Sequence, residues 1–239
     1  MPRGPSARSY LAIEWDYPVY ATAEEEPVAG SSAKKKRQAL SRAEALAYIA
    51  GEDTRPLLVL RECKVCNGTD DALLKPGADN EKTFLLSRWF HCVKLPVDVM
   101  DEDHPFHELF TLEAPEHLFV VSANGGNHDP LESQTSRTEL WGSMRDLVAL
   151  EYASKPDSAL KKIASILDKL DAADQRVLSL LEDRDDILEE DGPDSRKLPK
   201  LQKRIAAAEA ERDELHAEIA EASRLELKRQ SAGEAEAGK

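Results

Sequence analysis

The chain has 239 residues with 46 acidic and 32 basic side chains, a formal charge of −14, and only three cysteines. This length suffices for one or two domains, and no apolar run reaches the roughly eighteen residues of a membrane-spanning helix. The negative charge argues against nucleic acids and anionic membranes as partners. An odd cysteine count does not fit a secreted disulfide scaffold, and the first residues lack the apolar stretch of a secretory signal. A reducing, cytoplasmic location is therefore expected.

The first elements of the chain read as an edge strand, a helix and a buried strand. Apolar side chains at every second position over residues 11–19 predict a strand, and Pro18 places it at a sheet edge. A polar loop with a basic run at residues 34–37 follows. Ser41 then opens a helix in capping-box spacing that stops at Gly51. The continuous apolar run LLVL predicts a fully buried strand.

Strand and helix patterns continue to alternate up to residue 152. Cys92 begins one of these strands and is expected in the core. The turn sequence Asn124–Asn127 predicts a hairpin into a last strand. The remaining elements are expected as a helix over 81–90, a strand over 92–99, a short helix around 106–112, a strand over 117–123 and a helix over 138–152. This order predicts an α/β fold with a mixed sheet flanked by helices on both faces.

Cys63 and Cys66 form a C-x-x-C motif directly after the buried strand and before a predicted helix. Two intervening residues let both sulfurs sit on the first turn of one helix, close enough to form a disulfide. Unpaired amides and the helix dipole favour a thiolate at Cys63. Cys63 is then the attacking thiolate and Cys66 the resolving thiol. Two inert, buried thiols remain an alternative, because free cysteine packs as a small hydrophobic residue.

With this strand, C-x-x-C and helix, residues 10–152 resemble a thioredoxin-like domain. A second mark is Ala114-Pro115, which precedes the predicted strand HLFVVSA and its Gly-rich hairpin. The resemblance implies that Pro115 is a cis-proline that precedes the fourth strand and faces the cysteine pair. It also implies that Ala114 and Pro115 shape the groove for a partner's extended segment, and that no cofactor is needed beyond the cysteine pair.

The sequence departs from the thioredoxin pattern at three points. Glu62 stands where thioredoxins have a Trp before the first cysteine, and Lys64-Val65 stands where they have Gly-Pro. The strand before the motif lacks the buried Asp that relays protons in thioredoxins. These departures favour a thioredoxin-like protein with a particular partner over a general disulfide reductase.

A metal site is an alternative role for the cysteines. Cys63 and Cys66 are candidates to join His91, or His104 and His107. A structural zinc needs four convergent ligands, and the sequence has neither a second C-x-x-C nor a His pair with zinc-finger spacing. No metal is therefore expected. Nucleotide binding is not expected either, because the Gly-rich phosphate-binding motifs are absent.

After Lys155 come about 75 residues without an aromatic side chain. Apolar residues recur there at steps of three and four in two series separated by Gly192-Pro193, which predicts an antiparallel coiled-coil hairpin. The series are Leu160, Ile163, Leu167, Leu170, Asp174, Val177, Leu181, Arg184 and Leu188, and then Leu201, Ile205, Ala208, Arg212, Leu215, Ile219 and Ala222. Asp174 and Arg212 are either a register-setting pair or plain surface residues. The expected division is a domain over 1–155, the hairpin over 156–230 and a frayed tail over 231–239.

These features together predict a thiol–disulfide oxidoreductase that exchanges with a protein partner through Cys63 and Cys66. The helical hairpin is expected to dock that partner or to make a homo-oligomer. The rival interpretation is a non-catalytic adaptor that binds through the thioredoxin-like fold and assembles through the hairpin. A stiff, solvated hairpin with neither role also fits the pattern.

Overall fold

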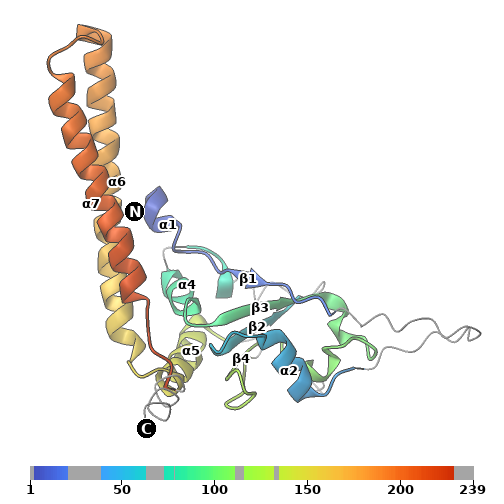
Figure 1. Cartoon of the computed structure of the whole chain (residues 1–239). Helices are drawn as coiled ribbons and strands as arrows, with labels where there is room; N and C mark the ends of the chain where they lie inside the picture. Colours follow the sequence, from blue (N-terminus) through green and yellow to red (C-terminus); the bar gives the residue numbers. More distant parts are fainter. Residues whose placement is uncertain are drawn as a thin grey trace, which may run out of the picture.

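The computed structural model describes residues 3–20, 39–62, 73–77, 79–110, 116–131 and 135–228. It consists of an α/β body and a long helical arm (Figure 1). The helices are α1 (Pro5–Arg8), α2 (Arg42–Ala50), α4 (Glu81–Ser87), α5 (Arg137–Glu151), α6 (Pro156–Asp191) and α7 (Leu198–Ala222), with 3-10 helices η1 (Val97–Met100) and η2 (His107–Phe110). The strands are β1 (Trp15–Asp16), β2 (Leu57–Arg61), β3 (His91–Leu95), β4 (Leu118–Val121) and β5 (Asp129–Leu131). Within these ranges, no helix combines the length and apolarity that crossing a bilayer requires.

The five strands form one mixed sheet in the order β1-β3-β2-β4-β5. Strands β1, β3 and β2 are parallel, whereas β4 runs antiparallel to β2 and β5 antiparallel to β4. The predicted α/β class with a mixed sheet is confirmed. The parallel strands are joined by crossovers, while the turn after β4 reverses the chain directly.

The strands bury both of their sides. Along β2, Leu58 and Leu60 belong to one core and Leu57 and Val59 to the other, following the two-residue period of a strand. Helices α4 and α5 cover the first side together with the lower part of the arm, and α2 covers the second with the two 3-10 helices (Figure 1). The predicted buried strand and the predicted helices on both faces are confirmed.

The residues predicted to begin or end helices and turns do so in the structure. Ser41 caps α2 in a reciprocal capping box with Glu44. Gly125 adopts a φ of +82° in the turn between β4 and β5, and Gly192 adopts a φ of +78° where α6 ends. Both conformations favour glycine, which has no Cβ to clash with the backbone. The predicted hairpin turn and helix break are confirmed.

The first predicted strand is much shorter than expected. Of residues 11–19, only Trp15–Asp16 form β1, and Tyr17 and Val19 lie exposed. Strand β1 stands first in the strand order of the sheet, next to β3. Pro18 has no N–H with which to extend the ladder, so the alternating pattern ends before its last apolar residues are buried.

The strand predicted over residues 92–99 is also shorter, since β3 ends at Leu95. Pro96 follows and lacks the N–H that a further ladder position needs, and the chain continues as η1. The short helix predicted around residues 106–112 is the 3-10 helix η2.

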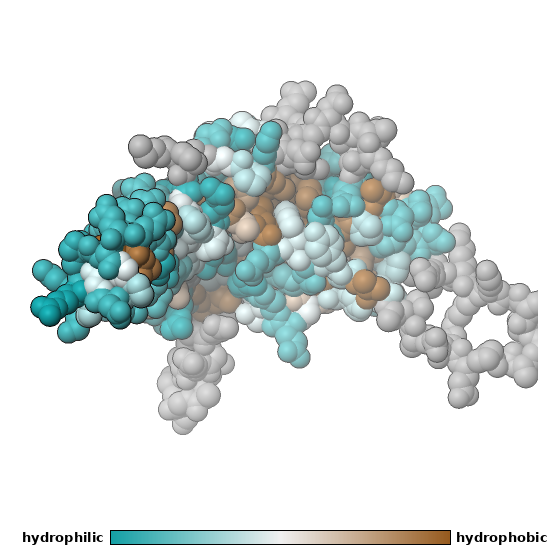
Figure 2. Space-filling model, turned by 90° about the horizontal axis from the view of Figure 1, so that it is seen from above, coloured by the Kyte–Doolittle hydropathy of each residue, from teal (hydrophilic) through white to brown (hydrophobic). Residues whose placement is uncertain are grey.

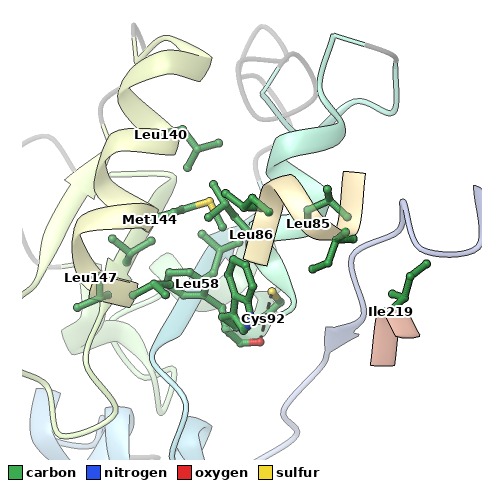
Figure 3. Packing of buried hydrophobic residues seen from close by; sticks show 14 of the residues in the cluster. Leu58, Leu85, Leu86, Cys92, Leu140, Met144, Leu147 and Ile219 are labelled. Atoms are coloured by element: carbon green, nitrogen blue, oxygen red, sulfur yellow. Dashed lines mark hydrogen bonds between the residues drawn. The ribbon is translucent and has the colours of Figure 1, made fainter. Parts of the chain in front are cut away.

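Helices α6 and α7 form the predicted antiparallel hairpin, which projects from the body as the arm (Figure 1). Ile219 of α7 shares one hydrophobic core with Leu58, Leu86 and Met144 of the body (Figure 3). Leu170 of α6 belongs to the same core. The distal part of the arm has a small core of its own, formed by Val177, Leu180, Leu201, Ile205 and Ala208. The body core therefore continues past the expected boundary at residue 155.

The chain that follows α7 returns to the body and closes this core. The indole Nε1 of Trp89 donates to the carbonyl of Ser223 at 2.8 Å. The amide of Ala153 donates to the carbonyl of Glu226 at 2.8 Å, next to an antiparallel bridge between Tyr152 and Leu227. Residues 223–227 thus join the end of α5 to the end of α7.

A buried carboxylate marks the middle of the arm. The side chain of Asp174 is only 7% exposed and lies 4.0 Å from Nη1 of Arg212 on α7. It also accepts hydrogen bonds from the amide of Ser6 at 2.9 Å and from its hydroxyl at 2.7 Å. The sequence allowed either a pair or plain surface residues at Asp174 and Arg212. In the structure the two side chains face each other across the hairpin.

The N-terminal residues 3–8, here called the strap, fasten the arm to the body (Figure 1). Arg3 makes a two-pronged ion pair with Glu81 of α4, at 2.8 and 2.9 Å. The same guanidinium donates to Asp171 at 2.8 Å and to Asp168 at 2.6 Å, both on α6. One arginine therefore neutralises carboxylates from two helices that would otherwise repel each other.

Replacing Arg3 with Ala is expected to lower the free energy of unfolding by about 1–2 kcal/mol, since Asp168 is largely exposed and solvent screens part of the attraction. Arg224→Ala, which removes an exposed ion pair with Glu221, is the matched control and is expected to cost less than about 0.5 kcal/mol. Urea denaturation at pH 7 measures both. Equal losses would contradict a fastening role for Arg3.

Candidate functional site

The C-x-x-C motif follows the end of β2, and Ala114-Pro115 precedes the start of β4. The two strands are antiparallel neighbours with Leu60 opposite Leu118, and the amide of Arg61 donates to the carbonyl of His117 at 2.8 Å. Cys63, Cys66, Ala114 and Pro115 lie outside the described residues. The last described residue before Cys63 is Glu62, and the first after Pro115 is Glu116. We call residues 61–62 and 116–117, which lie next to the two motifs, their stems. The structure places both stems side by side at one edge of the sheet, where β2 ends and β4 begins.

Charged and imidazole side chains gather at this edge, although the strands around them are apolar. We call Arg61, Glu116, His117 and His128 the edge cluster. The guanidinium of Arg61 is buried, with Nη2 at 3.3 Å from Nδ1 of His117, and it lies 5.6 Å from the centre of the Phe110 ring. A buried guanidinium places a fixed positive charge beside the stem that leads to Cys63.

The carboxylate of Glu116 is the most enclosed charge in the edge cluster. Its side chain is 2% exposed, and Oε1 lies 3.0 Å from Nε2 of His128. The contact is close but poorly aligned, so neither carboxylate oxygen has a well-formed hydrogen bond among the described residues. Burial raises the pKa of Glu116, but His128, its own backbone amide and the charge of Arg42 together leave it below the usual value. The group is thus held as a carboxylate.

Aromatic rings support the edge cluster from the α2 side of the sheet. The ring of His128 lies 4.9 Å from that of Phe119, which in turn packs against Phe110 at 5.8 Å. Arg42 of α2 lies 5.9 Å from the centre of the Phe119 ring and donates to the carbonyl of Leu109 at 2.7 Å. The ionisable groups are therefore held by rigid neighbours, as a chemically active site requires.

The charge of Glu62 is already engaged. Its carboxylate pairs with Lys94 of β3 at 2.7 Å, and its amide donates to the carbonyl of Leu95 at 2.9 Å. The carboxylate of Glu62 would otherwise disfavour a thiolate on the next residue. Pairing with Lys94 weakens that effect.

Cys92 lies in the body core and does not belong to the edge cluster. Its thiol is buried in the body core, with Sγ 3.6 Å from the carbonyl of Ser87 (Figure 3). Burial raises the pKa of Cys92 to about 12, so the thiol stays protonated and unreactive at neutral pH. The prediction that Cys92 is a core residue is confirmed.

Two of the three histidines that were candidate metal ligands bond to other groups, and Nδ1 of His107 is buried without a hydrogen-bond partner among the described residues. His91 pairs with Asp16 of β1 at 3.2 Å, and Nδ1 of His104 accepts the amide of Phe106 at 3.1 Å. Across the described ranges, no three His, Cys, Asp or Glu side chains are placed to hold a metal ion.

A cleft lies at the opposite end of the strands, near the start of β3. This cleft of about 630 Å³ is lined by charged side chains of both signs. Arg55 pairs there with Asp53 at 2.6 Å, and His91 pairs with Asp16. Because charges of both signs line the cleft, its lining does not favour a ligand of one particular charge.

The sequence reasoning did not single out the edge cluster. Arg61 follows an apolar run and Glu116 precedes one, and such residues usually lie at exposed strand ends. The available signal was their position in the sequence: Arg61 stands two residues before Cys63, and Glu116 directly follows Pro115. Pairing of β2 with β4 was needed to bring them together.

Comparisons with known proteins add no family to this picture: no protein-family model, curated protein or solved structure matches the chain. Its function is inferred below from its own residues and geometry.

Proposed function

We propose that the chain is a thioredoxin-like thiol–disulfide oxidoreductase in which Cys63 attacks and Cys66 resolves. One observation carries the proposal: β4, the fourth strand, pairs directly with β2, the strand that leads to Cys63. The resemblance implies a proline before the fourth strand that faces the cysteine pair. Two residues separate Pro115 from the start of β4, so the pairing supports this arrangement.

The proposed reaction transfers two electrons from the cysteine pair to a partner disulfide. The Cys63 thiolate attacks one partner sulfur, the partner S–S bond breaks, and the sulfur that leaves takes up a proton. Cys66 then loses its proton and attacks the Cys63 sulfur, which releases the second partner sulfur as a thiol. A cellular thiol reductant restores the cysteine pair by the reverse exchange.

The edge cluster supplies an electrostatic setting for this chemistry. The buried cation of Arg61 stands two residues before Cys63 and favours an anionic sulfur there. The carboxylate of Glu116 stands next to Pro115, and among the described residues it is the buried acid nearest in sequence to either motif. Thioredoxins have a buried Asp that relays protons, and β2 lacks it. Glu116, which precedes β4, would take over that role.

A glutathione redox titration of the Cys92→Ala variant tests the proposal, with disulfide scored by thiol alkylation and intact mass. We expect one reversible two-electron transition between about −180 and −300 mV. Cys63→Ser and Cys66→Ser in the same background are expected to abolish it. Two free thiols at every poise would refute the redox function.

An adaptor without catalysis is the second candidate, because the distal part of the arm has a core separate from that of the body. An arm of this kind can present a binding surface while the body does no chemistry. The adaptor function predicts that the Cys63→Ser, Cys66→Ser double variant keeps all of its assembly. The oxidoreductase function predicts that this variant loses its mixed disulfides with partners.

A further inference from the structure

An apolar groove of about 520 Å³, here called the β1 groove, lies beside β1 on the side of the sheet that α4 covers. Eight of the ten described residues that line it have apolar or aromatic side chains, among them Leu11, Ile13, Trp15 and Leu74. Binding sites for small molecules commonly have volumes of roughly 300–1,000 Å³ and mostly apolar walls. The β1 groove has both properties.

The apolar walls of the β1 groove are only partly covered by the chain. Leu11, Ile13 and Trp15 follow the two-residue period of this segment and pack on the body core, yet each stays half-buried, as does Leu74. Figure 2 looks down on the β1 side of the body and shows a hydrophobic area in its middle, between hydrophilic residues. Because apolar surface in contact with water is unfavourable, a ligand with an apolar body gains free energy by covering these side chains.

The charges that line the β1 groove are all positive. Lys75 and Lys94 line it, and none of its described lining residues is acidic. Three other concave regions of the described chain, at the start of β3, between α4 and α6 and at the tip of the arm, are each lined by at least two acidic residues. In a chain with a formal charge of −14, a groove with two lysines and no carboxylate favours an anionic ligand.

The two lysines differ in how far they are already engaged. Lys94 pairs with Glu62 at 2.7 Å, which holds its ammonium group in place. Lys75 is exposed and forms no ion pair with the described residues. Since an ammonium group has three hydrogens to donate, Lys94 can serve Glu62 and a ligand at once. Lys75 is therefore the main anchor for an anion, and Lys94 is a second one.

The hydrogen-bonding side chains that line the β1 groove are donors only. They are the ammonium groups of Lys75 and Lys94 and the indole N–H of Trp15. An ionised carboxylate only accepts hydrogen bonds and therefore matches them. An amine or a peptide brings N–H groups for which these side chains offer no acceptor. The chemistry of the lining thus favours a carboxylate over a cation or a peptide.

We propose that the β1 groove binds a small carboxylate with an apolar body, such as a medium-chain fatty acid. The apolar chain covers Leu11, Ile13 and Leu74, and the carboxylate accepts hydrogen bonds from the ammonium group of Lys75. This inference does not depend on the thiol chemistry, because none of the described lining residues belongs to the C-x-x-C motif or to Ala114-Pro115.

Isothermal titration calorimetry of the full chain with decanoate, in the presence of a thiol reductant, tests the proposal. We expect decanoate to bind at one site with a dissociation constant of about 1 mM or below. Decyltrimethylammonium, which has an alkyl chain of similar length and the opposite charge, is expected to bind at least tenfold more weakly. The same is expected of acetyl-leucyl-leucine amide, which tests a peptide as the occupant. A peptide or a cation that binds more tightly than decanoate would refute the proposal.

Substitutions at the β1 groove locate the site. Lys75→Glu replaces the anchoring cation with a carboxylate and is expected to weaken decanoate binding at least tenfold. Lys203→Glu reverses an exposed lysine on α7 and is the matched control, which should leave the dissociation constant unchanged. Leu74→Gln makes one apolar wall polar and is expected to weaken binding at least fivefold. Thermal unfolding of each variant checks that the fold is kept. No binding at 5 mM decanoate, or equal affinities for wild type and Lys75→Glu, would overturn the proposal.

Discussion

Cutting the chain after residue 155 is expected to unfold the body rather than to release it as a separate domain. The body core includes apolar side chains from the arm and from the residues after it. They are Leu160, Ile163, Ile166, Leu167, Leu170, Ala173, Leu215, Ile219 and Leu227. Each buried leucine or isoleucine among them is worth about 1.5–3 kcal/mol, and a whole domain is stable by only about 5–15 kcal/mol. The fragment of residues 1–155 should therefore show no cooperative thermal unfolding by circular dichroism.

A shortened arm is the matched control for this truncation. Replacing residues 178–208 with a short Gly-Ser turn removes the distal core but keeps Asp174 and Arg212, and all that lies below them. This variant is expected to unfold cooperatively and to keep the redox transition. Cooperative unfolding of the 1–155 fragment would show that the arm and the body are independent.

The second large effect is expected from removing His128. His128→Ala leaves the Glu116 carboxylate buried without its nearest partner, and the expected loss at pH 7 is about 1–3 kcal/mol, because a buried polar group that loses its partner keeps its desolvation cost. Glu116→Gln removes the charge itself and should cost less. His91→Ala is the control and should cost about 1 kcal/mol or less, because its partner Asp16 is more than half exposed.

The pH dependence of stability distinguishes the charge of Glu116 from its packing. The pKa of Glu116 in the folded chain is below the ordinary value of 4.5, so ionised Glu116 stabilises the fold above that pH. This contribution is lost as the pH falls through the folded pKa. The difference in unfolding free energy between wild type and Glu116→Gln should be largest near pH 7 and should shrink below pH 4.5. Urea denaturation at pH 7, 5 and 3.5 measures it, and a difference that does not change with pH would contradict the role of the charge.

Local signals in the sequence predicted local structure well. The Ser41 capping box, the glycine turn after β4 and the break at Gly192 depend on residues within a few positions of one another. The apolar run of β2 also identified a strand buried on both sides. Each of these features is set by backbone geometry and short-range hydrogen bonds, which the sequence shows directly.

Features built from distant residues could not be predicted in the same way. Arg3 meets Asp171 across 168 positions, and Glu116 meets His128 only through the turn between β4 and β5. The seam of α6 was ambiguous as well, since the helix has leucines at both 180 and 181 and only Leu180 is buried. The helix has more apolar residues than one seam can bury, because its lower half packs on the body as well as on α7.

The contacts of residues 215–227 also bear on the order in which the molecule can fold. These residues close the core that β2, α4 and α5 begin, so the α4 side of the sheet is fully covered only after almost the whole described chain has been made. During synthesis on the ribosome, part of this apolar surface therefore stays uncovered until α7 emerges. Contacts of such long sequence separation slow folding and expose the nascent chain to aggregation. A holding chaperone is expected to meet this protein early in its life.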